Sequence, residues 1–142
     1  MTNTNYILKR DIPITFSAVA ASDIGYDSTG KTWPEPPDTT VGLLLQFVDD
    51  QTVDLCDVSS GEYFAGVSEV PAYAGERITV RTCGIILCTA GATVVAGQPV
   101  KVDDGTSQRV KPAGATEATK IIGRAITGGS TGDKVKVLLR GY

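Results

Sequence analysis

The feature that most restricts the fold of this chain is its wealth of β-branched residues, interrupted throughout by glycine and proline. Val, Ile and Thr account for 42 of the 142 residues, alongside 16 Gly and 7 Pro. β-branched side chains favour strands, whereas Gly and Pro favour turns and interrupt helices. A chain of this length forms one domain and can bury a hydrophobic core without disulfide or metal support. We therefore expect an all-β protein, either a small barrel or a sandwich.

Alternating apolar and polar residues place most of the strands after residue 40. Ile78 and Val80 alternate with charged or polar neighbours, and residues 134–140 alternate in the same way. This period of two is typical of half-buried strands. The Asp-Asp-Gly sequence at 103–105 is typical of a hairpin turn. The predicted strands are 41–48, 53–58, 62–67, 76–89, 99–102, 108–111, 120–127 and 134–140.

The sequence divides into three segments of different composition. Residues 1–21 are predicted to be an extended N-terminal arm, residues 22–40 a Gly- and Pro-rich surface loop, and residues 41–142 the β domain. The loop holds Trp33 beside three prolines within four residues, which excludes a helix or a central strand. Trp33 either contacts a partner or covers the apolar underside of its own loop.

The arm has one apolar side, formed by Ile12, Ile14 and Phe16 around Pro13. Because proline cannot donate a hydrogen bond to a sheet ladder, such a segment suits an edge position. Two interpretations remain open, namely an arm that adds a strand to a neighbouring protein and the first strand of the domain itself. The candidate contact residues for a partner are Tyr6, Ile7, Leu8, Ile12, Ile14, Phe16 and Trp33.

A second candidate contact is the apolar run of residues 84–88. Ile85, Ile86 and Leu87 follow one another without alternation, so both faces of this strand need cover. A barrel interior or a partner subunit would supply that cover. We therefore take Ile85, Ile86 and Leu87 as candidates for a subunit interface.

Charge is divided unevenly along the chain. Residues 1–71 carry a net charge of −8 and residues 72–142 a net charge of +5. Acidic and basic faces either neutralise each other within one domain or meet between subunits. The acidic total of −3, without basic and aromatic residues in alternation, argues against a nucleic-acid partner. No apolar run is long enough to cross a membrane and no signal peptide is recognisable, so we expect a soluble chain.

Several patterns that suggest chemistry are explained better as structure. The chain has no histidine, which excludes the common histidine-dependent nucleophile arrangements. Residues 25–32 match the phosphate-binding loop pattern and Ser28 to Lys31 the Ser-x-x-Lys pattern, but Pro34 and its neighbours prevent the helix that both require. We expect no enzyme, no cofactor and no catalytic residue.

Two further groups of residues invite a metal or redox interpretation. Aspartates at 49, 50, 54 and 57 could gather around Ca²⁺, but their spacing fits no EF-hand loop and a solvated strand-turn-strand is preferred. Cysteines at 56, 83 and 88 are odd in number, and Cys83 and Cys88 would point to opposite faces of one strand. We interpret them as buried thiols of a protein made in a reducing cytoplasm. No metal site is predicted.

From residue 64 onward, a series of short motifs follows in a specific order. The motifs are FAGVSE at 64–69, AGE at 74–76, ITV at 78–80, CGII at 83–86, VAGQPVK at 95–101, IIGRA at 121–125 and GDKVKVLL at 132–139. Together they resemble the capsid decoration, or cement, proteins of tailed phages. The resemblance covers about 80 residues and does not extend to residues 1–60.

This resemblance implies a structural protein of the virion. It implies a small β-rich module that forms homotrimers on the outer surface of the expanded head and clamps neighbouring major capsid subunits. The partners would be the major capsid protein and other copies of the chain, and synthesis would take place in the host cytoplasm. Two alternatives are a carbohydrate-binding β module that stacks sugars on Tyr26, Trp33 and Tyr63, and a nucleotide-binding protein that uses residues 25–32.

Overall fold

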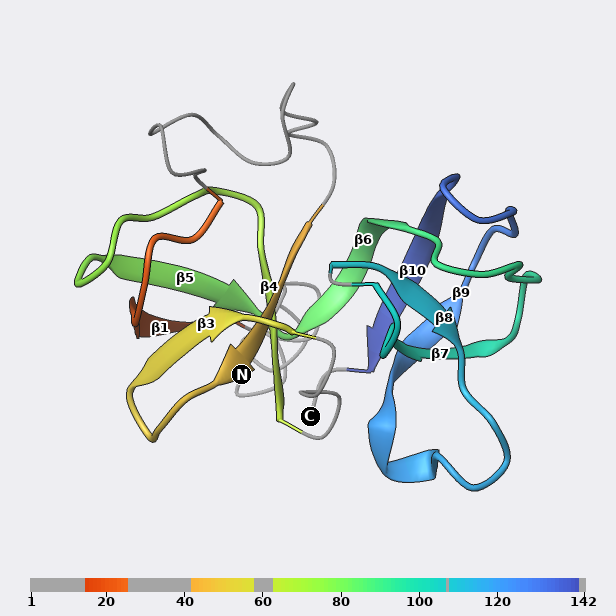
Figure 1. Ribbon diagram of the computed structural model, residues 1–142, viewed down its shortest axis with the longest axis horizontal. Helices are drawn as coiled ribbons and strands as arrows, with labels where there is room; N and C mark the ends of the chain where they lie inside the picture. The colour runs from red at the N-terminus through yellow and green to blue at the C-terminus, as the bar shows by residue number, and fades with distance from the viewer. Residues whose placement is uncertain (1–14, 26–41, 58–62, 107, 141–142) are drawn as a thin grey trace, which may run out of the picture.

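The fold consists of two β-sheets that follow one another along the chain (Figure 1). A computed structural model describes residues 15–25, 42–57, 63–106 and 108–140. Within these residues the regular secondary structure is all strand, apart from one short 3₁₀ helix, η1, at Ala118–Lys120. The predicted all-β class is confirmed. The remainder of the predicted arm (residues 1–14) and most of the Pro-rich loop (residues 26–41) lie outside the described residues.

The first sheet closes into a barrel with the strand order β1-β3-β2-β4-β5. Strand β1 runs antiparallel to β5 on one side and pairs in parallel with β3 on the other, so it completes the closure. The strands are β1 (Thr15–Ala20), β2 (Leu43–Phe47), β3 (Thr52–Leu55), β4 (Phe64–Ser68) and β5 (Arg77–Arg81).

The second sheet has the order β6-β10-β9-β7-β8 and occupies the other side of the molecule in Figure 1. Its longest ladder joins β6 to β10 in antiparallel register from Cys83↔Arg140 to Thr89↔Lys134. The strands are β6 (Cys83–Thr89), β7 (Pro99–Val102), β8 (Val110–Pro112), β9 (Ile121–Ala125) and β10 (Lys134–Arg140). The ranges predicted for β7 and β10 coincide with the observed strands.

The continuous strand predicted for residues 76–89 is divided in two. Strand β5 ends at Arg81 in the barrel and β6 begins at Cys83 in the second sheet, so Thr82 marks the passage between them. Gly84, the second residue of β6, has φ +99, and a Cβ there would lie 2.4 Å from a guanidinium nitrogen of Arg81. Only glycine therefore suits this position without displacing Arg81.

The two sheets share a hydrophobic core. Inward residues of the second sheet, including Ile86, Val135 and Val137, pack in one cluster with Leu44 and Val67 of the barrel. The barrel has a smaller cluster of its own, which includes Ile24, Leu45, Val53, Ile78 and Val80. Because successive strand residues point to opposite faces, Leu44 and Leu45 enter different clusters.

The side chain of Gln108 links the two sheets by hydrogen bonds. Its amide oxygen accepts a hydrogen bond from the N–H of Leu44 (2.8 Å), and its amide nitrogen donates to the carbonyls of Leu44 (2.8 Å) and Cys56 (3.2 Å). Gln108 is buried and has a left-handed backbone, with φ +60. A non-glycine residue in this region costs about 1 kcal/mol or more, so the three hydrogen bonds must offset that cost.

Candidate functional site

The outward face of the second sheet combines exposed apolar side chains with basic ones. Ile85 of β6 lies opposite Leu138 of β10, which in turn lies opposite Arg124 of β9. Two residues further along, Leu87 lies opposite Lys136, and at the end of the ladder Cys83 lies opposite Arg140. We define the basic sheet face as Ile85, Leu87, Arg124, Lys136, Leu138 and Arg140.

The apolar centre of this face is open to solvent. Ile85 is 53% exposed and Leu138 47% exposed, and they are neighbours across the ladder. Strand alternation produces this arrangement, because Ile86, Val137 and Leu139 point the opposite way into the core. Adjacent exposed apolar side chains on a soluble protein mark a contact surface more often than isolated ones do.

The charge of this face has a single sign. Strands β6, β9 and β10, which are described along their whole length, contain Arg124, Lys134, Lys136 and Arg140 and no acidic residue. In β10 the sequence alternates basic or apolar outward residues with buried ones, so the positive charges share one side. The face is therefore suited to a partner surface that is acidic and partly apolar.

A hollow of about 390 Å³ opens on the same face. The Arg124 guanidinium, on its rim, donates a 2.7 Å hydrogen bond to the carbonyl of Gly97, which fixes its direction. The lining combines apolar surface with guanidinium groups, so it suits the docking of a partner surface. The lining residues are Pro99, Ile121, Gly123, Arg124, Leu138, Leu139 and Arg140.

The three candidate interface residues Ile85, Ile86 and Leu87 lie on two different faces of β6. Ile85 is exposed and Leu87 half-buried on the outward side, whereas Ile86 is only 3% exposed and belongs to the core. The run therefore receives cover on one face from the chain's own core. Ile86 is corrected from a surface contact to a core residue, because strand alternation turns it inward.

Phe16 is the one arm candidate within the described residues. It lies in β1, half-buried against the barrel core, and its ring stacks on Phe47 with centroids 5.8 Å apart. Residues 15–20 of the predicted arm thus form a barrel strand, as the second interpretation of this segment supposed. Tyr6, Ile7, Leu8, Ile12, Ile14 and Trp33 lie outside the described residues.

Tyr63 is the one carbohydrate-stacking candidate in the described part of the chain, where its side chain is 63% exposed. Tyr26 and Trp33 lie outside that part, as does the phosphate-binding pattern after Gly25. Among the described residues, no three His, Cys, Asp or Glu side chains gather as metal ligands would. No helix in the described ranges is long and apolar enough to span a membrane.

Of the aspartates considered as Ca²⁺ ligands, Asp49 holds the turn between β2 and β3, and Asp54 lies in β3. A carboxylate oxygen of Asp49 accepts hydrogen bonds from the N–H groups of Gln51 and Thr52, both at 2.8 Å. These backbone hydrogen bonds lower the pKa of Asp49, because they stabilise its ionised form. Asp54 accepts a 2.6 Å hydrogen bond from the Ser22 hydroxyl. The preferred strand-turn-strand interpretation agrees with this geometry.

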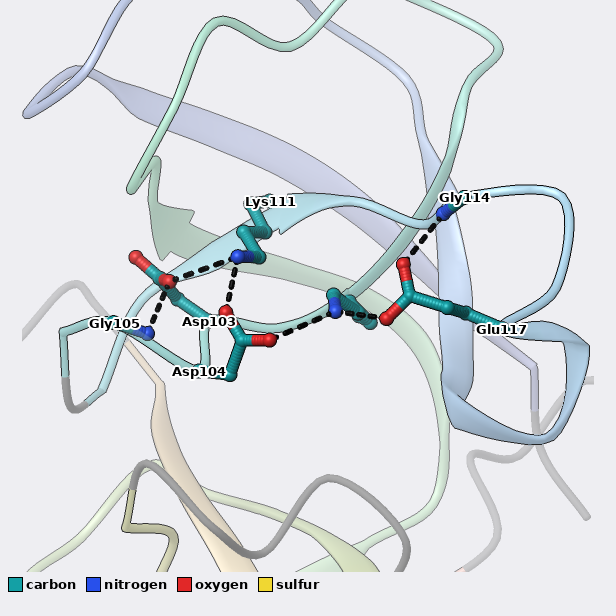
Figure 2. A network of polar contacts seen from close by, with 7 residues as sticks. Asp103, Asp104, Gly105, Lys111, Gly114 and Glu117 are labelled. Carbon is teal, nitrogen blue, oxygen red and sulfur yellow. Dashed lines mark hydrogen bonds and ion pairs between the residues drawn. The ribbon is translucent and has the colours of Figure 1, made fainter.

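Sequence reasoning missed a charged network beside the β7–β8 hairpin. Figure 2 shows Asp103, Asp104 and Lys111 at one end of this network and Glu117 at the other. The ammonium of Lys101 joins both ends, pairing with Glu117 and, at 3.2 Å, with Asp104. Lys111 pairs with Asp104 and lies 3.7 Å from an oxygen of Asp103.

This network contains a buried charge that is well neutralised. The Lys101 side chain is only 4% exposed, and its hydrogen bond to Glu117 raises the pKa of Lys101. Hydrogen bonds from Lys111 and then Lys101 lower the pKa of Asp104 to about 2, and the one from Lys101 lowers the pKa of Glu117. Because Glu117 also accepts a hydrogen bond from the N–H of Gly114, the network ties the hairpin to the loop before η1. Its role is structural.

Comparisons with known proteins bear on the family and on the fold. A family model described as phage cement protein matches residues 38–141. Among solved structures, the fold is similar to the one described as the crystal structure of head fiber gp8.5 N base in bacteriophage phi29, with a TM-score of 0.51 and 15% identity. The match covers 90% of this chain and 94% of that one. No curated protein matches the sequence.

Proposed function

The chain belongs to the phage cement protein family, and from this premise we propose that it binds the outer surface of the phage head as trimers and clamps neighbouring major capsid subunits. The observation that carries the proposal is the family match over residues 38–141. The family is structural, so its members act by holding proteins together. The structural neighbour, named as the base of a head fiber, supports a place on the head.

Clamping requires contact surfaces, and the described residues offer one. The basic sheet face presents apolar and cationic side chains on a rigid sheet. A sheet face holds its side chains in fixed positions, so little conformational entropy is lost on binding. Repeated over a lattice of identical sites, contacts that are weak singly give strong attachment.

We further propose that the segment before β1 contacts the major capsid protein. Pro13 and the apolar residues around it suit the addition of an edge strand, which provides main-chain hydrogen bonds without a pocket. Because β1 (Thr15–Ala20) pairs with β5 in the barrel, we place the contacting segment ahead of this strand. The contact residues would be Tyr6, Ile7, Leu8, Ile12 and Ile14, with Trp33 from the Pro-rich loop.

The buried thiols support synthesis in the host cytoplasm. Cys56 and Cys88 lie in the shared core, and burial raises the pKa of the Cys88 thiol to about 12. A protonated, buried thiol is a poor nucleophile and resists oxidation. These cysteines therefore act as core residues, and the proposed role uses no cofactor.

The proposal is tested by adding the purified protein to expanded heads that lack it. The full chain should co-sediment with the heads to saturation, and a chain of residues 15–142 should not, although circular dichroism shows that its β-structure is intact. Failure of the full chain to bind would contradict the function. Normal binding by the shortened chain would contradict only the assignment of residues 1–14.

A further inference from the structure

We propose that copies of this chain join head to tail, with the turn between β2 and β3 of one copy seated on the basic sheet face of the next. The inference rests on the self-association in the proposed function and assigns the two surfaces that make it. We call residues 47–50 the acidic turn; they are Phe47, Val48, Asp49 and Asp50. Four observations support this pairing.

The first observation is the division of charge between the two sheets. Of the described residues up to Arg81, seven are acidic and two basic, whereas from Thr82 onward four are acidic and eight basic. Three of those four acidic residues, Asp103, Asp104 and Glu117, are already held by Lys101 and Lys111. They consequently do not neutralise the basic sheet face.

The second observation is the distance between the two surfaces in one copy. In Figure 1 the turn between β2 and β3 lies at the lower left, on the side of the barrel away from the second sheet. The acidic turn therefore cannot reach the basic sheet face of its own chain. Since the two surfaces cannot pair within one molecule, the acidic turn of one copy is free to attract the basic sheet face of another.

The third observation is that the two surfaces match in apolar character as well as in charge. Phe47 and Val48 are 44% and 56% exposed, and Asp49 and Asp50 follow them directly. The hollow on the basic sheet face places Leu138 beside the guanidinium of Arg124. Phe47 and Val48 can cover the apolar centre of the face while the carboxylates approach its basic groups.

The fourth observation is that the acidic turn is already ordered. Asp49 fixes the turn through its hydrogen bonds from Gln51 and Thr52, and Phe47 is stacked on Phe16. A segment that is rigid before binding loses little entropy on association. Asp50 makes none of these turn contacts and points the second carboxylate outward, as its exposure indicates.

The geometry of such a contact also suits a closed assembly. The two surfaces differ, so the contact is heterologous and every copy offers one of each. A heterologous contact repeated around a symmetry axis closes into a ring in which all the surfaces are used. This is the arrangement that a trimer with cyclic symmetry requires.

The test reverses the charge of one residue on each surface of the isolated protein. Sedimentation equilibrium over a wide concentration range measures self-association. We expect the natural chain to self-associate and both Asp50→Lys and Arg124→Glu to raise the dissociation constant about tenfold or more, because each places like charges together. The double variant Asp50→Lys/Arg124→Glu should regain most of the lost affinity. Arg77→Glu, the same change on the barrel, serves as the matched control and should leave association unchanged.

Three results would overturn the inference. One is a natural chain that stays monomeric at every concentration, and another is a double variant no better than the single ones. The third is an Arg124→Glu variant that self-associates normally but no longer binds heads, which would assign the basic sheet face to the capsid protein instead. Because self-association is measured without heads, a failure here is distinct from a failure of the proposed capsid role.

Discussion

The barrel and the second sheet differ most in what their outward faces carry. On the barrel, outward positions of β1 and β5 hold polar partners such as Ser17 opposite Thr79. On the second sheet, the corresponding positions of β6 and β10 hold Ile85 opposite Leu138, both about half exposed. Both sheets bury their inward residues equally well. The difference therefore concerns recognition and not folding, because apolar side chains left in water contribute nothing to a core.

The largest expected effect comes from breaking the link between the two sheets at Gln108. Gln108→Glu replaces two donated hydrogen bonds with a buried carboxylate that faces the carbonyl oxygens of Leu44 and Cys56. We expect a loss of about 3 kcal/mol in the free energy of unfolding near neutral pH. Urea denaturation followed by circular dichroism of the β-structure measures this loss.

The pH dependence of this variant provides its control. Burial raises the pKa of the new carboxyl group in the folded state above its unfolded value of about 4.3, so the destabilisation caused by the charge is complete only above the folded pKa. It shrinks as the pH falls from the folded pKa toward the unfolded one, and it is absent below about pH 4. Gln108→Gly, which removes the side chain and relieves the backbone strain, should cost less than Glu and show no such pH dependence. Equal losses for Glu and Gly at neutral pH would contradict the role given to the amide.

The next largest effect on stability is expected in the charged network around Lys101, the buried lysine of the second sheet. Glu117→Ala leaves the buried ammonium of Lys101 with Asp104 alone, whereas Lys101→Met removes the buried charge and leaves only carboxylates that reach solvent. We expect Glu117→Ala to lower the free energy of unfolding more than Lys101→Met does, because only the first variant leaves a buried charge without its main partner. Thermal unfolding of the two variants side by side checks the order, and the reverse order would show that Lys101 is not held as described.

A smaller loss of stability is expected at low pH, through the protonation of Asp104. The pKa of Asp104 is held at about 2 in the folded chain by Lys111 and Lys101, below its unfolded value of about 3.9. A depressed pKa gives stability that is complete above the unfolded pKa and is lost as the pH falls toward the folded one. The natural chain should therefore lose more stability between about pH 5 and pH 2 than Lys111→Met. Parallel losses in both chains would exclude the network as the source.

The smallest effect on stability is expected at the exposed centre of the basic sheet face. Leu138→Thr and Ile85→Thr keep β-branched or strand-compatible side chains at outward positions, so each should change the free energy of unfolding by no more than about 0.5 kcal/mol. Each should nevertheless weaken self-association in sedimentation experiments, because the contact loses apolar area. A large loss of stability would show that these side chains belong to the core.

The fold could be predicted from the sequence wherever the information is local. Alternation in residues 134–140 and the Asp-Asp-Gly turn after Val102 predicted β10 and the β7–β8 hairpin correctly. The division into two sheets was missed, because residues 76–89 are uniformly suited to strand and the break at Thr82 depends on packing between distant segments.

The candidate site could be predicted only in part, for the same reason. The apolar run at 84–88 pointed to Ile85 and Leu87, but Leu138 and Arg124 join them through strand pairing across more than 35 residues. The role of Gln108 depends on contacts with Leu44 and Cys56, far away in sequence. Lys101 between two core valines was the one local signal of a buried ion pair, and its partner Glu117 could not be inferred from spacing.

The central claim, that this chain is a structural component of the phage head, is tested most directly by quantitative mass spectrometry of purified phage particles. The account predicts that the chain is present in a fixed stoichiometric ratio to the major capsid protein and is accessible to surface labelling on intact heads. Absence from the particles, or presence only in trace and variable amounts, would contradict it.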